Sequence, residues 1–147
     1  MRDPAKEALG LRVATALRAR EASSDFLGLS LEGAGEGWAR CSMVVRAEML
    51  NGLETCHGGL IFSLADNAFA WACNSHNVKT FAQHAAISFL SPARRGEKLT
   101  AEAREEFAEG RTGVYTVRVT GEDGRVVAVF QGLSRTAGGA VLEETND

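Results

Sequence analysis

One carboxylate interrupts the longest apolar stretch of this chain, and its position makes it the first candidate for chemistry. Between residues 58 and 73 the only charged residue is Asp66. An ionised carboxylate is costly in apolar surroundings unless it is paired, and desolvation raises its pKa, which is one way a protein makes a general base. The alternative is a structural role, in which Asp66 bonds a backbone donor and holds two elements in register.

A glycine pair opens the same stretch. Gly58 and Gly59 follow the turn pair Asn51-Gly52 and precede the apolar run. Glycines at the mouth of a helix present free N–H groups with the positive end of the helix dipole behind them, which suits a developing oxyanion. Alternatively, glycine is needed there for a tight approach to a neighbouring strand.

The element that positions these groups is a predicted buried helix over residues 58–73. At about 100° per residue, one face is apolar and largely small, and the second face carries Asp66 among large apolar residues, so we expect a core helix packed against a sheet. The first face holds Ile61, Leu64, Ala65, Ala68 and Ala72, and the second Phe62, Phe69 and Cys73.

The spacing of the two candidate groups sets a limit on how they act. Gly58 and Asp66 are eight residues apart, roughly 12 Å along one helix at about 1.5 Å per residue, which is too far to act on one carbonyl. If both are catalytic, they come from different subunits. Two antiparallel helices across a two-fold axis would then give two equivalent sites per dimer.

These residues carry a resemblance to a known family. The run 57–66, with Asn51 before it and residues 67–75 after it, resembles the hotdog-fold acyl-CoA thioesterases of the phenylacetic acid degradation type, and residues 89–99 look like that family's strand-turn-strand. The resemblance extends from about residue 25 to 137. It implies a hotdog fold, hydrolysis of an aryl- or arylacetyl-CoA, and a homodimer with shared sites that assembles into a homotetramer.

The resemblance also implies roles for individual residues. Asn51 and the Gly58 N–H would polarise the thioester carbonyl, and Asp66 would activate water or attack directly. His57 would lie by the thiolate leaving group or orient the loop through Asn51; its alternative role is to cap the helix. Some relatives position water with a hydroxyl from the strand after the helix, for which the nearest candidates are Thr80 and Ser88.

Four basic residues are candidates for the phosphates of coenzyme A. They fall in two strand turns that we expect to be adjacent, and basic side chains are compact phosphate-recognition elements. Ordinary solvated turn charges are the alternative. The four are Arg94, Arg95, Lys98 and Arg111.

Composition excludes several other classes of protein. A chain of 147 residues with net charge −3 suits a single domain over residues 1–147 and gives no electrostatic footprint for nucleic acid or an anionic membrane. The three cysteines lack the pattern of a disulfide framework or a metal site, and no signal-peptide core opens the chain, so we expect a cytoplasmic protein with no cofactor beyond the coenzyme A of its substrate. No Gly-x-Ser-x-Gly elbow is present in the sequence, which disfavours a serine-hydrolase mechanism.

The remaining pattern predicts an α+β fold. Residues 3–20 form an amphipathic first helix, and residues 26–46 form a hairpin turning through the glycine-rich residues 33–37. Strands follow over residues 80–90, 99–107, 113–120 and 126–135, giving five or six antiparallel strands curled round one long helix. From Gly138 onward we expect a frayed tail.

Two other functions compete with hydrolysis. Hydratases and dehydratases on the same fold pair a histidine with an acid at a shorter helical spacing, whereas the residue five after Asp66 is Trp71. The other is a non-catalytic acyl-CoA-binding module. A sensor of that kind has little reason to keep a desolvated Asp66 beside an oxyanion pocket.

Overall fold

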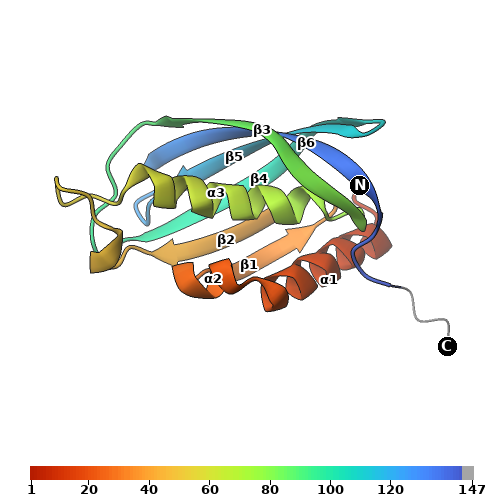
Figure 1. Ribbon diagram of the computed structural model, residues 1–147, viewed down its shortest axis with the longest axis horizontal. Coiled ribbons are helices and arrows are strands. Elements are labelled where there is room, and N and C mark those ends of the chain that lie inside the picture. Colours follow the sequence, from red (N-terminus) through yellow and green to blue (C-terminus); the bar gives the residue numbers. More distant parts are fainter. Residues whose placement is uncertain (144–147) are drawn as a thin grey trace.

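The structure is a computed structural model that describes residues 1–143. One long helix rests on the inner face of a curved antiparallel sheet (Figure 1). The sheet has six strands in the order β1-β2-β4-β5-β6-β3. The predicted α+β architecture is therefore confirmed. The helices are α1 (Pro4–Arg20), α2 (Ala22–Leu27), the 3₁₀ turn η1 (Ala47–Met49) and α3 (Gly58–Cys73), and the strands are β1 (Ser30–Gly35), β2 (Trp38–Val44), β3 (Val78–Phe89), β4 (Lys98–Glu109), β5 (Thr112–Thr120) and β6 (Val126–Ala140).

The central helix α3 is buried in the way its sequence pattern predicts. All five residues of its small apolar face are buried, and Phe69 on the second face is fully buried too. The ring of Phe69 packs on β6 at Gly132. A Cβ at residue 132 would lie only 2.7 Å from the ring, so the glycine makes room for it. The sheet and α3 thus share one hydrophobic core.

The first helix, α1, begins at Pro4 after the cap residue Asp3, whose carboxylate accepts from the Ala5 N–H at 2.9 Å. It lies alongside β1 at the sheet edge (Figure 1). Glu7 fixes it there by accepting hydrogen bonds from the Trp38 indole at 2.9 Å and from the Glu36 N–H at 3.0 Å. Over residues 1–143, none of the helices has the length and apolar character needed to cross a membrane.

The hairpin at the start of the sheet differs from the prediction. Phe26 belongs to the short helix α2 rather than to a strand, and α2 is capped by Gly28, which adopts a left-handed conformation with φ of 68°. The turn between β1 and β2 contains only Glu36 and Gly37, because residues 33–35 continue β1. The glycine-rich composition is therefore a property of the strand end as well as of the turn.

The predicted frayed tail is also wrong for the residues that the structure describes. Strand β6 runs to Ala140, which pairs with Val78. Beyond it, the Asn77 side chain bonds both backbone groups of Leu142, at 2.7 and 3.2 Å, and Val141 is buried. Strand pairing and burial thus hold this segment in place, while residues 144–147 lie outside the described part of the chain.

Strand β3 forms one edge of the sheet and leaves one side of a 12-residue strand unpaired within the described chain. A β-bulge interrupts its pairing with β6 between Ala82 and His84. Phe81 and Phe89 on this strand are 66% and 52% exposed. A long, open edge with exposed aromatic side chains is a template for pairing with another strand.

Candidate active site

The loop over residues 51–57 positions the start of α3. Asn51 organises it, because its side-chain oxygen accepts from the backbone N–H groups of Leu53 at 2.9 Å and Thr55 at 3.1 Å. A bridge between Leu50 and Cys56 closes the loop. Glu54 at its tip has a φ of 63°, an uncommon conformation for a residue other than glycine. The loop is thus held by its own hydrogen bonds.

The first turn of α3 offers unfilled donors. The N–H groups of Leu60 and Ile61 both donate to the His57 carbonyl, at 3.0 and 3.3 Å, and the His57 N–H donates to the Met49 carbonyl. Within the described chain, this leaves the N–H groups of Gly58 and Gly59 without a backbone acceptor. They lie at the positive end of the α3 dipole.

A cavity of about 380 Å³ brings Asn51 and Gly58 together at this point. Its lining comes from the 51–57 loop, the first turn of α3 and the end of β3: Asn51, Thr55, Cys56, Gly58, Ile61, Phe89, Leu90, Ser91 and Pro92. The Asn51 amide donates one N–H to the Thr55 hydroxyl at 3.0 Å and has a second N–H to offer. The cavity therefore combines two candidate donors for a carbonyl oxygen with apolar walls.

His57 lies beside this cavity but does not line it. Its ring is exposed and its side chain makes no capping hydrogen bond to α3. His57 is the N-cap residue of α3, as the structural alternative predicts, but its side chain takes no part in the cap. Its backbone, in contrast, accepts the first hydrogen bonds of the helix.

Asp66 stands on α3 two turns beyond Gly58 and outside the cavity lining. Burial raises the pKa of this carboxyl above its ordinary value, and within residues 1–143 no hydrogen bond or cation counteracts that effect. The structural alternative requires a backbone donor for Asp66, and the described chain provides none. A desolvated carboxylate with a raised pKa is a stronger base than an ordinary one, which suits it to accept a proton.

Two of the four predicted phosphate ligands lie next to the cavity. Arg94 and Arg95 line a depression of about 580 Å³ with Pro92, Glu97 and Arg125. Pro92 borders both hollows, so the basic depression adjoins the cavity at Gly58. Both arginines are exposed.

The other two predicted ligands are placed differently. Lys98 pairs with Glu32 at 3.3 Å. Arg111 follows β4, whose 12 residues separate it from Lys98 by roughly 35 Å at about 3.3 Å per residue. The expectation of two adjacent turns is therefore wrong, because the β3–β4 and β4–β5 connections lie at opposite ends of the sheet (Figure 1).

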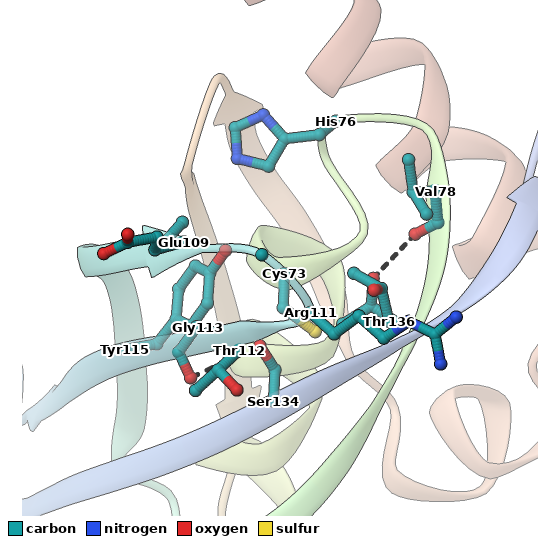
Figure 2. Close-up of a pocket in the computed structure, with 13 residues that line it drawn as sticks. Cys73, His76, Val78, Glu109, Arg111, Thr112, Gly113, Tyr115, Ser134 and Thr136 are labelled. Carbon is teal, nitrogen blue, oxygen red and sulfur yellow. Dashed lines mark hydrogen bonds between the residues drawn. The ribbon is translucent and has the colours of Figure 1, made fainter.

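Arg111 instead borders a second cavity, of about 230 Å³, at the far end of α3 (Figure 2). Tyr115 lines this cavity, and its hydroxyl donates to Glu105 at 2.6 Å. The His76 ring lies 2.8 Å from the same carboxylate. Neither Gly58 nor Asp66 is among its lining residues, so this cavity contains none of the predicted catalytic groups.

Neither candidate hydroxyl for positioning water faces Asp66. The Thr80 hydroxyl donates to the Val78 carbonyl at 2.7 Å and borders the second cavity. Ser88 pairs with Val129 across β6 and points away from α3, because its neighbour Ile87 packs against the core. Within one described chain, no hydroxyl from β3 therefore serves Asp66.

Two residues of the site have no role predicted from the sequence. Phe89 covers the start of α3, and Arg125 closes the basic depression. Only a contact between distant segments reveals them. Cys56 also lines the cavity, but burial raises the pKa of its thiol to about 11, so it is no thiolate nucleophile at neutral pH.

An antiparallel sheet wrapped round a buried helix, with free N–H donors at the start of that helix, suits the binding of a thioester carbonyl. The chain belongs to the Thioesterase superfamily, whose family model matches residues 53–128. It is 40% identical to the acyl-coenzyme A thioesterase PaaI of Escherichia coli (strain K12) over 131 residues, covering 89% of this chain and 94% of that one. A putative esterase of Archaeoglobus fulgidus is 43% identical over 97 residues, covering 66% of this chain and 63% of the esterase.

Solved structures agree with this assignment. The E. coli PaaI protein, from the phenylacetic acid degradation operon, superposes with a TM-score of 0.90 at 38% identity, covering 92% of this chain and 98% of that chain. The TT0310 protein of Thermus thermophilus gives a TM-score of 0.76 at 34% identity, covering 79% of this chain and 97% of that chain. The resemblance seen in the sequence and the hotdog fold that it implies are thereby confirmed.

Proposed function

We propose that this protein is an acyl-CoA thioesterase that hydrolyses an aryl- or arylacetyl-CoA at sites shared between two subunits. One observation carries the proposal: Asn51 and Gly58 line one cavity, whereas Asp66, the only charged residue of α3, lies two turns away without a partner in the described chain. A second copy of α3, antiparallel to the first, would supply Asp66 to that cavity.

The chemistry of such a site divides between the two subunits. The Asn51 amide and the Gly58 N–H would bind the thioester oxygen and stabilise the negative charge that develops on it. Asp66 of the second subunit would remove a proton from water as the C–O bond forms, or attack the carbonyl carbon itself. On the first route the C–S bond then breaks, the thiolate takes up the proton that Asp66 removed from water, and the acid is released. On the second route the thiolate leaves as the acyl group is transferred to Asp66, and water then hydrolyses that anhydride, which releases the acid and restores the carboxylate. His57 would lie beside the leaving sulfur.

The acyl group is inferred from the walls of the site. Phe89 and Leu90 border the cavity. Aromatic walls favour an aromatic guest through ring contacts. The E. coli relative from the phenylacetic acid degradation operon supports the same class.

The dimer is inferred from the sheet edge. The open edge of β3 carries Phe81 and Phe89, and pairing it with its own copy would extend the sheet and cover both rings. Since Phe89 also covers Gly58, such an interface would pass next to the cavity. Two such dimers would form the tetramer that the family resemblance implies.

Trp71 argues against the hydratase alternative. Its side chain is fully buried and its indole N–H donates to Glu21 at 3.0 Å, on the side of α3 that faces α2. The position where those relatives hold a catalytic histidine is therefore occupied by a core residue. No substrate reaches it.

Release of thiol from a panel of acyl-CoAs tests the proposal. We expect phenylacetyl-CoA and its ring-hydroxylated forms to have the highest kcat/KM, with straight-chain acyl-CoAs lower. Binding of these compounds without thiol release would identify an acyl-CoA-binding module instead. Addition of water to an enoyl-CoA without loss of CoA would identify a hydratase.

A further inference from the structure

The guanidinium of Arg125, just before β6, connects two turns of the chain. Its Nη1 donates to Asp123 at 2.9 Å within its own turn. Its Nε donates to the Ser91 hydroxyl at 3.0 Å and its Nη2 to the Pro92 carbonyl at 3.1 Å. Nη2 also donates to Glu97 at 2.6 Å. Four of its five N–H groups are thus in use, and they hold both ends of the loop over residues 91–97.

Glu97 carries this restraint to the phosphate-binding residues. One of its carboxylate oxygens accepts from Arg125, and the other accepts from the backbone N–H of Arg94 at 3.0 Å. The side chain of Glu97 is only 17% exposed. A Cβ at Gly121 would lie 2.4 Å from the same carboxylate, so the pair fits closely against that turn.

The 91–97 loop is in turn bonded to the 51–57 loop. The Cys56 N–H donates to the Ala93 carbonyl at 2.8 Å, and a bridge joins Thr55 to Arg94. Both loops lie at the same end of the sheet (Figure 1). A hydrogen-bonded path therefore runs from Arg125 through the 91–97 loop to the residue before His57.

We propose that Arg125 is a positioning residue, which holds the phosphate-contacting arginines and the 51–57 loop in register through the 91–97 loop. The proposal rests on the thioesterase function above. It assigns Arg125 the role of bonding the loop, not of contacting a phosphate, since four of its five N–H groups already donate to protein acceptors. Loss of the hydrogen bonds from the Arg125 guanidinium to the 91–97 loop would displace both the phosphate subsite and the oxyanion donors.

The replacements R125K and R125Q distinguish the two roles. Lysine keeps the positive charge beside Arg94 and Arg95 and is a good point-charge ligand for phosphate, but it cannot make the forked set of bonds. A phosphate contact would therefore survive in R125K and fail in R125Q. A positioning role fails in both. R104Q is the matched control, because Arg104 is also ion-paired, to Glu102 at 2.9 Å, but lies away from both loops.

Two substrates give the decisive readout: a CoA thioester, and the corresponding pantetheine thioester, which lacks the nucleotide phosphates. For R125K and R125Q we expect kcat/KM to fall about 10- to 100-fold on both substrates, since a displacement of about 1 Å in the donors is enough for such a loss. KM for the CoA thioester should also rise, and R104Q should match the wild-type protein. Melting temperatures of all variants are measured alongside.

The four possible outcomes separate the alternatives. Equal losses in R125K and R125Q on both substrates support the positioning role, provided that the variants remain folded at the assay temperature. Loss confined to the CoA thioester in R125Q, with R125K active, overturns it in favour of a direct phosphate contact. Wild-type activity in R125K and R125Q also overturns it. A wild-type protein that hydrolyses neither thioester instead refutes the function on which the proposal rests.

Discussion

The start of α3 lies beneath an aromatic ring: a Cβ added at Gly58 would stand 2.9 Å from Cζ of Phe89. This contact explains the glycine without any special backbone angle, because Gly58 has ordinary helical geometry and is excluded from carrying a side chain only by its neighbour. It also brings the end of β3 to the cavity that contains Asn51. Packing and the proposed chemistry therefore impose the same requirement on one residue.

Replacing Gly58 by alanine should lower kcat/KM and leave the melting temperature almost unchanged. The added methyl group pushes Phe89 and enters the space where the carbonyl would bind, so we expect kcat/KM to fall about 10-fold or more. The ring is half exposed and can move. The melting temperature should therefore change little.

Gly59→Ala is the control for this variant. A Cβ there meets only the His57 ring, at 3.9 Å, and Gly59 does not line the cavity. Alanine favours the helix by about 1 kcal/mol over glycine, so this variant should melt slightly higher with normal activity. Equal activities of the two variants would show that the Gly58–Phe89 contact has no role in the reaction.

The basic depression gives a prediction about substrate affinity. Replacing Arg94 and Arg95 together by alanine should raise KM for acyl-CoA with little change in kcat, since phosphate contacts are remote from the reacting carbon. Arg111→Ala provides the comparison, because Arg111 lies at the other end of the sheet. An unchanged KM in the double variant would make the two arginines ordinary surface charges.

The edge strand gives a prediction about assembly. Phe81→Lys places a charge on the open edge of β3, which opposes pairing of two copies. We expect light scattering to show monomers, and thiol release to be lost with them. Phe107→Lys tests the specificity of this effect, because Phe107 is also exposed but lies on the interior strand β4. A monomeric Phe81→Lys variant with full activity would refute shared sites.

The sequence predicts the parts of this protein that local pattern determines. The helix over 58–73, its buried faces and the strands from β3 to β6 follow from periodicity, and the proximity of Asn51 to Gly58 follows from a short loop. Predictions fail where contacts between distant residues determine the structure. The segment after Gly138 is predicted to fray, but Asn77 holds it by bonding Leu142. The error over Arg111 has another origin, because the strand predicted over residues 99–107 already places the turns before and after it at opposite ends of the sheet.

Asp66 should give the protein a specific pH dependence. Because its pKa is raised in the folded state, the folded protein binds more protons than the unfolded chain at pH values between the ordinary pKa of 3.8 and the raised one. Stability contributed by this group therefore falls as pH rises through that window and stays low above it. Asp66→Asn removes the effect, so the variant should gain stability over the wild-type protein as pH rises.

Activity should follow the opposite trend, because the reaction needs the ionised carboxylate. We expect kcat/KM to decline below an apparent pKa that lies above 3.8, and Asp66→Asn to lower kcat on the order of 10²–10⁴-fold while substrate still binds. Denaturant melts and pH–rate profiles measure the two trends. A variant that is less stable than the wild-type protein yet fully active per folded molecule would make Asp66 structural.

Complementation between two inactive variants tests the central claim most directly. Asp66→Asn lacks the carboxylate, and the double variant Asn51→Ala/Gly58→Ala lacks the Asn51 amide and places a methyl group where the carbonyl would approach the Gly58 N–H. When the two are coexpressed with different tags and the hybrid dimer is purified, shared sites predict one intact site and one doubly defective site, hence about half the wild-type thiol release per dimer. A hybrid dimer that is as inactive as its parents would show that each site is built within one subunit and would contradict the account.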